Sequence, residues 1–201
     1  MVGALDARYE DSAVIALVAS AGGLAAVSEV LAGLPADLNA AVIVLIHQQP
    51  ERESTLAQVL GRHSTLPVEI AHDETLLRAG TVMVAPPGKH VLIAPGPKVS
   101  LIVSGAAPPS RPSADLLLAT LATTCGPRAT AVVLSGGGHD GATGATAVHH
   151  FGGTVVASSE LTSEHFSMPQ ATIDRDAATV HIVALNDIAA QLASIVATTR
   201  V

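Results

Sequence analysis

The sequence predicts one α/β domain, built on a doubly wound, mostly parallel sheet with helices on both faces and an inserted β-hairpin region in the middle. Apolar runs of strand length alternate with longer segments whose apolar residues repeat at helical spacing, which is typical of such a sheet. The chain is 49% hydrophobic but holds only one Tyr and two Phe, so Ala, Val, Leu and Ile must fill its core. Such a core suits buried parallel strands covered by Ala-rich helices. A length of 201 residues favours a single domain.

The individual elements follow from this alternation. After a first apolar run, the residues Ser20-Ala21-Gly22-Gly23 lead into a segment of helical period that Pro35 ends. The expected strands are 14–19, 41–46, 129–134, 154–157 and 180–183. The expected helices are 24–34, 53–62, 113–124, 140–150 and 186–198.

The middle section, residues 66–104, departs from this regular pattern. Its short β-rich segments are separated by Pro and Gly, which predicts added strands or a hairpin. Terminal residues are often poorly ordered, so we expect residues 1–12 to be a disordered N-terminus. Residues 13–201 are then the single folded domain.

Charge and targeting signals narrow the class of protein. The formal net charge is −7 and no stretch concentrates Lys or Arg, which argues against a nucleic-acid partner. Cys125 is the single cysteine and cannot form an internal disulfide, and the N-terminus has neither a basic start nor an apolar targeting core. The apolar runs are too short to span a bilayer. We therefore expect a cytoplasmic protein without membrane insertion.

Three polar groups stand where predicted strands end. Ser20 follows the first strand, His47 follows the second, and Asp140 lies in the glycine-rich loop 135–141 after a later strand. Ligands gather beyond the carboxyl ends of the strands in an open α/β sheet. A hydroxyl, an imidazole and a carboxylate are the parts of a Ser-His-Asp triad, which occurs in several chain orders. The sequence thus predicts a serine hydrolase site.

Each of these residues also has a simpler interpretation. Ser20 could cap the following helix, a common role for serine, and His47 could be a polar strand end that backbone groups satisfy. Imidazole and carboxylate are also zinc ligands, so a metal site of His47, His139 and Asp140 is a further alternative. We do not expect a metal.

The glycine loop carries a competing motif. Gly136-x-Gly138-x-x-Gly141 lies between a predicted strand and helix, as a dinucleotide-binding fingerprint does, and Glu160 stands where a ribose ligand would. Against this, Asp140 would place a carboxylate at the helix N-terminus that a pyrophosphate needs. The motif also lies late in the chain, whereas dinucleotide domains carry it in their first βα turn.

Taken in order, the strand ends resemble the catalytic domain of CheB-type protein-glutamate methylesterases. The family's G-A-S-T-G-G is similar to residues 18–23, which places its nucleophile on Ser20. Its Q-H-M-P is similar to residues 46–50 and places the base on His47, and its T-G-M-G-N-D-G is similar to residues 135–141 and places the orienting acid on Asp140. Supporting similarities lie at 80–90, 110–118 and 165–172.

The resemblance has departures beside each triad position. The residues that differ from the family pattern are Ala21, Gln48 or Gln49, Gly137 and His139. The family's oxyanion hole implies backbone N–H groups of Ala21 and Gly137, which survive a change of side chain. The remaining substrate-binding positions are expected at Gly22, Gly23, Gly138 and Met168.

The resemblance implies an enzyme that hydrolyses glutamate methyl esters on methylated chemoreceptors and also deamidates glutamine, without metal or organic cofactor. The family's receiver domain has no counterpart in this sequence, so we expect an isolated catalytic domain, a stand-alone protein or a fragment. A receiver domain or a histidine-kinase pathway protein is then an expected partner. A non-catalytic regulatory module of the same fold is the second hypothesis, because residues flanking the triad are altered.

Overall fold

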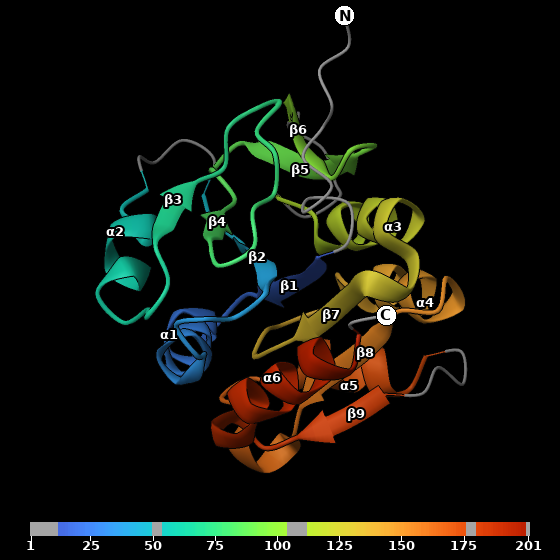
Figure 1. Ribbon diagram of the computed structural model, residues 1–201. Coiled ribbons are helices and arrows are strands. Elements are labelled where there is room, and N and C mark those ends of the chain that lie inside the picture. Colours follow the sequence, from blue (N-terminus) through green and yellow to red (C-terminus); the bar gives the residue numbers. More distant parts are fainter. Residues whose placement is uncertain (1–11, 50–53, 104–111, 176–179, 200–201) are drawn as a thin grey trace, which may run out of the picture.

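The computed structural model describes residues 12–49, 54–103, 112–175 and 180–199. A seven-stranded sheet in the order β3-β4-β2-β1-β7-β8-β9 forms the centre, and all its pairings are parallel (Figure 1). Its strands are β1 Ala13–Ala19, β2 Ala40–Ile46, β3 Val68–Ile70, β4 Val82–Val84, β7 Ala129–Val133, β8 Thr154–Ser158 and β9 Val180–Val183. An antiparallel hairpin of β5 Lys89–Ala94 and β6 Lys98–Val103 lies apart from it.

Helices cover both faces of the sheet, so its central strands are almost entirely apolar, with Thr130 as the one polar residue in β1, β2 and β7. They are α1 Gly23–Gly33, α2 Leu56–Gly61, α3 Ala114–Cys125, α4 Ala142–His150, α5 Ser167–Ile173 and α6 Ile188–Thr198. Short 3₁₀ turns are η2 Gly126–Arg128, η3 Glu160–Thr162 and η4 Leu185–Asp187. Alternate residues of the fully buried β1 face opposite sides: Val14 packs in the core with α3, α4 and the hairpin, and Ile15 in the core with α1, α2 and α6. The sequence pattern of uninterrupted aliphatic runs follows from this burial on both faces.

The predicted fold class is confirmed, and most elements lie within a residue or two of their expected bounds. The helix expected at 140–150 begins later, at Ala142, because Gly141 is its N-cap with φ 103°, a conformation that favours glycine. The expected helix 186–198 divides into the turn η4 and α6. The short helix α5 was not anticipated. Residues 1–11, on which the expectation of a disordered N-terminus mainly falls, lie outside the described part.

The middle section contains more than an inserted hairpin. The strands β3 and β4 join the main sheet beside β2, and only β5 and β6 form the hairpin. The hairpin packs on α3, where the Ile93 N–H donates to Thr120 Oγ1 at 3.0 Å. Sequence alone could not separate the two kinds of strand, because each is a short apolar run between Pro or Gly residues.

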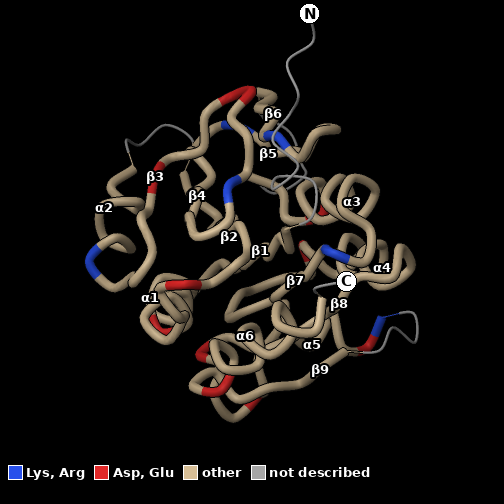
Figure 2. Tube along the Cα trace, in the orientation of Figure 1, with Lys and Arg blue, Asp and Glu red and all other residues tan. Residues whose placement is uncertain are grey.

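Surface charge is dispersed in the described part of the chain. Acidic and basic residues are interleaved near the hairpin, where Lys98 forms an ion pair with Glu74 (Figure 2). No helix of the described residues is both long enough and apolar enough to cross a bilayer.

Candidate active site

The three predicted triad residues lie at the carboxyl edge of three neighbouring strands. Ser20 follows β1, His47 follows β2, and Asp140 lies in the loop between β7 and α4. Backbone hydrogen bonds fix this edge: the His47 N–H donates to Ala19 O at 3.1 Å, and the Ser20 N–H donates to Ser135 O at 2.9 Å. Parallel strands necessarily bring their carboxyl ends to the same edge, so residues distant in sequence meet here.

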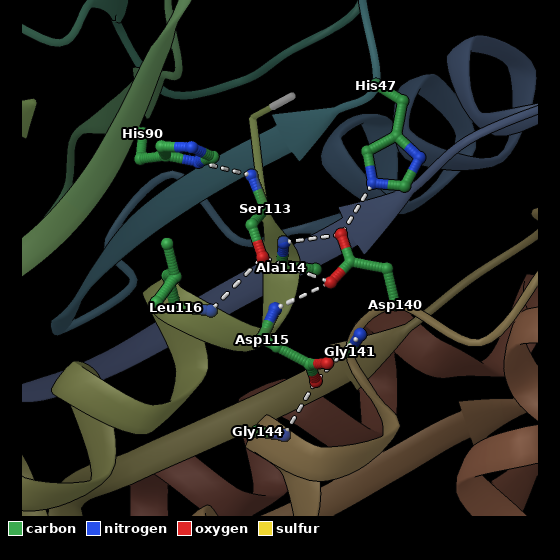
Figure 3. Close-up of polar contacts among 9 residues, drawn as sticks. All are labelled: His47, His90, Ser113, Ala114, Asp115, Leu116, Asp140, Gly141 and Gly144. Carbon is green, nitrogen blue, oxygen red and sulfur yellow. Dashed lines mark hydrogen bonds and ion pairs between the residues drawn. The ribbon is translucent and has the colours of Figure 1, made fainter. Parts of the chain in front are cut away.

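His47 and Asp140 are in direct contact. The His47 Nε2 lies 2.8 Å from Asp140 Oδ2, and their side chains are 18% and 10% exposed (Figure 3). An ionised carboxylate only accepts hydrogen bonds, so Nε2 carries the hydrogen. The neutral tautomer then leaves Nδ1 free of a proton and able to accept one. The hydrogen bond expected between the two side chains is therefore formed through Nε2, and their roles as base and orienting acid stay predictions.

The first turn of α3 binds the Asp140 carboxylate. The carboxylate accepts hydrogen bonds from the Ala114 N–H at 2.8 Å, the Asp115 N–H at 3.0 Å and the Ser113 hydroxyl at 3.2 Å (Figure 3). Burial opposes ionisation of Asp140, but the hydrogen bonds from His47 and these N–H groups outweigh it and lower its pKa. Asp140 therefore stays charged at neutral pH, and its contribution to stability is lost only as the pH falls through that lowered pKa.

Ser20 lies in a tight turn rather than in a helix cap. The N-cap of α1 is Gly22, with φ 72° and no side-chain cap, so the capping interpretation of Ser20 is wrong. No hydrogen bond joins the Ser20 hydroxyl to His47 in the described part of the chain. Catalytic hydrogen bonds often form fully only with substrate, and the expected close approach of these two groups stays a prediction.

The glycine loop is bound to the turn that carries Ser20. The Ser135 hydroxyl donates to Ala21 O at 2.8 Å and accepts from the His165 N–H at 3.0 Å. The Gly136 N–H donates to His165 O at 2.9 Å and so is not available to an oxyanion. Within the described residues, no hydrogen bond engages the N–H groups of Ala21 or Gly137, the pair expected in the oxyanion hole.

At Gly136 the glycine loop packs closely against both Ser20 and Met168. A Cβ at this position would lie 3.0 Å from Ser20 Cβ and 2.2 Å from Met168 Sδ. Met168 is fully buried beneath the loop, which favours a supporting role, and its expected part in substrate binding stays a prediction.

We expect Gly136→Ala to lower kcat/KM by up to about 100-fold, because the added methyl group overlaps Met168 Sδ and presses on Ser20 Cβ, and a misplacement of ~1 Å at a reacting group has effects of that size. Overpacking should also lower the free energy of unfolding by about 1–3 kcal/mol. Ester hydrolysis and urea unfolding measure the two effects. Gly61→Ala is the matched control, since its Cβ would have ordinary contacts only. Equal activity of both variants would contradict the proposed close packing.

A hollow of about 560 Å³ opens beside Ser20. Gly22 and Gly23 line it together with the apolar side chains of Leu24 and Val59, and the expected part of these glycines in substrate binding stays a prediction. Gly138 is exposed in the glycine loop, and its role stays a prediction. Cys125 carries the single thiol of the sequence, and burial raises its pKa to about 11, so it stays protonated and does not compete with Ser20 as a nucleophile.

The described residues support neither the dinucleotide-binding site nor the metal site that the sequence left as alternatives. The Asp115 carboxylate occupies the N–H groups of Gly141 and Gly144 at the start of α4, where a pyrophosphate would have to bind. Asp140 itself turns to α3, which corrects the expectation that it would face the α4 N-terminus. The described residues contain no group of three or more metal-ligating side chains, so His139 does not join His47 and Asp140 in one.

Sequence reasoning missed the groups that surround Asp140. Ser113 and Asp115, which bind Asp140, lie in the segment 110–118, and His90, which binds Ser113, lies in the segment 80–90; residues 110 and 111 are outside the described part. The available signal was that Ser113 is the first residue of the predicted helix 113–124 and an acidic residue follows in the first turn, which is typical of a helix start.

Comparisons with known proteins show which family this chain resembles. A model of the CheB methylesterase family matches residues 15–192. A protein-glutamate methylesterase/protein-glutamine glutaminase of Myxococcus xanthus is 38% identical over 92% of this chain and 54% of its own length, and one of Moorella thermoacetica is 34% identical over 96% and 46%. The chain thus spans about half the length of these relatives.

A solved structure gives the same result for the fold. The CheB methylesterase catalytic domain of Thermotoga maritima superposes with a TM-score of 0.86 at 29% identity, covering 92% of this chain and 99% of that one. The extent of the family match, the identity to the relatives and the shared fold lead to one conclusion: this chain belongs to the CheB methylesterase family.

Proposed function

We propose that this chain is a serine hydrolase that cleaves the methyl esters of glutamate side chains in chemoreceptor-type proteins and deamidates glutamine side chains. The observation that carries the proposal is the 2.8 Å contact between His47 Nε2 and Asp140 Oδ2 at the sheet edge that also bears Ser20. The relatives' names, protein-glutamate methylesterase/protein-glutamine glutaminase, supply the substrate class.

The reaction begins with transfer of the Ser20 hydroxyl proton to His47 Nδ1. The serine oxygen attacks the ester carbonyl, and the N–H groups of Ala21 and Gly137 stabilise the oxyanion that forms. Collapse of this intermediate breaks the C–O bond, and His47 returns the proton to the departing methanol. Asp140 stabilises the cationic imidazole through Nε2.

Water completes the cycle. His47 removes a proton from the water as it attacks the acyl-enzyme, and the return of that proton to Ser20 releases a glutamate carboxylate. With glutamine as substrate, the leaving group is ammonia and the same product forms. Every charge that develops is met by groups of this chain, so the proposed reaction uses no metal or organic cofactor.

The proposed substrate is a methylated chemoreceptor or related protein in the cytoplasm. A receiver domain or a histidine-kinase pathway protein is the proposed regulatory partner, since the chain spans about half the length of its relatives.

Methanol release from a methylated receptor peptide, with ammonia release from the matching glutamine peptide, tests the proposal. We expect both products, and their absence with every receptor peptide tried would overturn the assigned substrate class. Labelling by a fluorophosphonate reports on the triad without any peptide.

A further inference from the structure

Next to the proposed triad, the N-termini of two neighbouring helices, α3 and α4, are each bound by a carboxylate from the other helix or from the loop before it. Asp140, which precedes α4, accepts from the first-turn N–H groups of α3 at Ala114 and Asp115. Asp115, which belongs to α3, accepts in return from Gly141 at 3.0 Å and Gly144 at 2.8 Å, at the start of α4 (Figure 3). Each helix N-terminus is thus neutralised by a carboxylate of the other segment, and each carboxylate lies at the positive end of a helix dipole.

Close packing of the two helices makes this exchange feasible. A Cβ at Gly144 would lie 2.5 Å from Leu118 Cβ and 2.9 Å from Asp115 O, so only glycine lets α4 approach α3 this closely. On the other side, the Ser113 N–H donates to Nδ1 of the buried His90 at 3.0 Å and fixes the start of α3. The backbone that carries Asp115 is therefore held in place on both sides.

Asp115 holds the backbone directly after Asp140. Gly141 is the residue directly after Asp140, and Asp115 binds its N–H through a single oxygen, Oδ1. The same Oδ1 binds the Gly144 N–H, so one atom ties down the loop that carries the triad acid. Without it, the peptide after Asp140 loses its anchor, and so does the first turn of α4.

We propose that Asp115 is a positioning residue, which places Asp140 against His47 by binding the start of α4. This inference rests on the proposed hydrolase function. The carbonyl oxygen of asparagine can replace Oδ1 as acceptor, because both N–H groups bind that one atom. The geometry of the oxygen, rather than its full charge, is therefore what the site needs.

The test compares Asp115→Asn, Asp115→Ala and Asp115→Glu in ester hydrolysis and in the rate of fluorophosphonate labelling. We expect asparagine to retain activity within about threefold, and alanine to lose about 10- to 100-fold in kcat with little change in KM, in line with a displacement of ~1 Å. Glutamate keeps the charge but moves the oxygen by one methylene group, so it should lose activity as alanine does. Asp187→Ala, an N-cap residue of α6 without a side-chain cap, is the control and should match wild type.

A double-mutant cycle with Asp140→Asn separates positioning from general loss of structure. If Asp115 acts through Asp140, then Asp115→Ala should cost no further activity once Asp140 is neutralised, whereas a purely structural defect costs the same factor in both backgrounds. Circular dichroism measures the folded fraction. If the alanine variant does not fold, the asparagine and glutamate variants decide the matter alone.

Two failures are distinguishable. Wild-type protein that is labelled by fluorophosphonate but releases no methanol overturns the substrate proposal and leaves the labelling rates to test Asp115. Asp115→Glu as active as Asp115→Asn, or full additivity in the cycle, overturns the positioning role. Wild-type protein that is neither labelled nor active overturns the triad and, with it, this inference.

Discussion

Ser20→Ala is expected to lower kcat for a glutamyl methyl ester by about 10⁶-fold and to abolish covalent labelling by a fluorophosphonate. The reason is that no acyl-enzyme can form without the serine oxygen, and the remaining groups offer only binding and oxyanion stabilisation. The surrounding turn is held by backbone bonds, such as Ser20 N–H to Ser135 O, so the variant should fold normally. Intact-mass analysis of labelled protein measures the loss directly.

Ser194→Ala is the matched control for this experiment, because Ser194 is exposed on α6 and remote from the strand edge in sequence and fold. It should be labelled like wild type. Labelling that persists in Ser20→Ala would assign the nucleophile to another residue. Folded wild-type protein that resists labelling altogether would favour the alternative of a non-catalytic module.

His47→Ala is expected to lower kcat by a similar factor, about 10⁶-fold, because the serine proton then has no acceptor. His139 is the competing base by sequence position, since it stands beside Asp140 in the glycine loop. In the structure, however, the ring that contacts Asp140 is that of His47, while His139 is exposed and its carbonyl accepts from the Ala142 N–H. His139→Asn, which restores the residue of the family pattern, should therefore retain turnover.

Kinetics of the two histidine variants on one methylated peptide decide between these bases. An active His47→Ala together with an inactive His139→Asn would reverse the assignment. Loss of activity in both would mean that the glycine loop depends on the His139 side chain in a way that the described contacts do not account for. Urea unfolding of each variant controls for stability.

The sequence by itself determined the central strands and the placement of Ser20, His47 and Asp140 just beyond strand ends. The uninterrupted aliphatic runs of β1 and β2, and the mostly aliphatic run of β7, could be read because strands buried on both faces are composed mainly of aliphatic residues. The common edge of these three residues could be predicted because parallel strands place whatever follows them at the same edge of the sheet.

Tertiary structure alone decided how those residues are held. The assignment of β3 and β4 to the main sheet depends on pairing with β2, which no local pattern encodes. The contact of His47 through Nε2, and the exchange of Asp115 and Asp140 between α3 and α4, each join segments far apart in the chain. The exchange between α3 and α4 also depends on how closely these two helices pack, and the missing side chain of Gly144 beside Leu118 sets that distance.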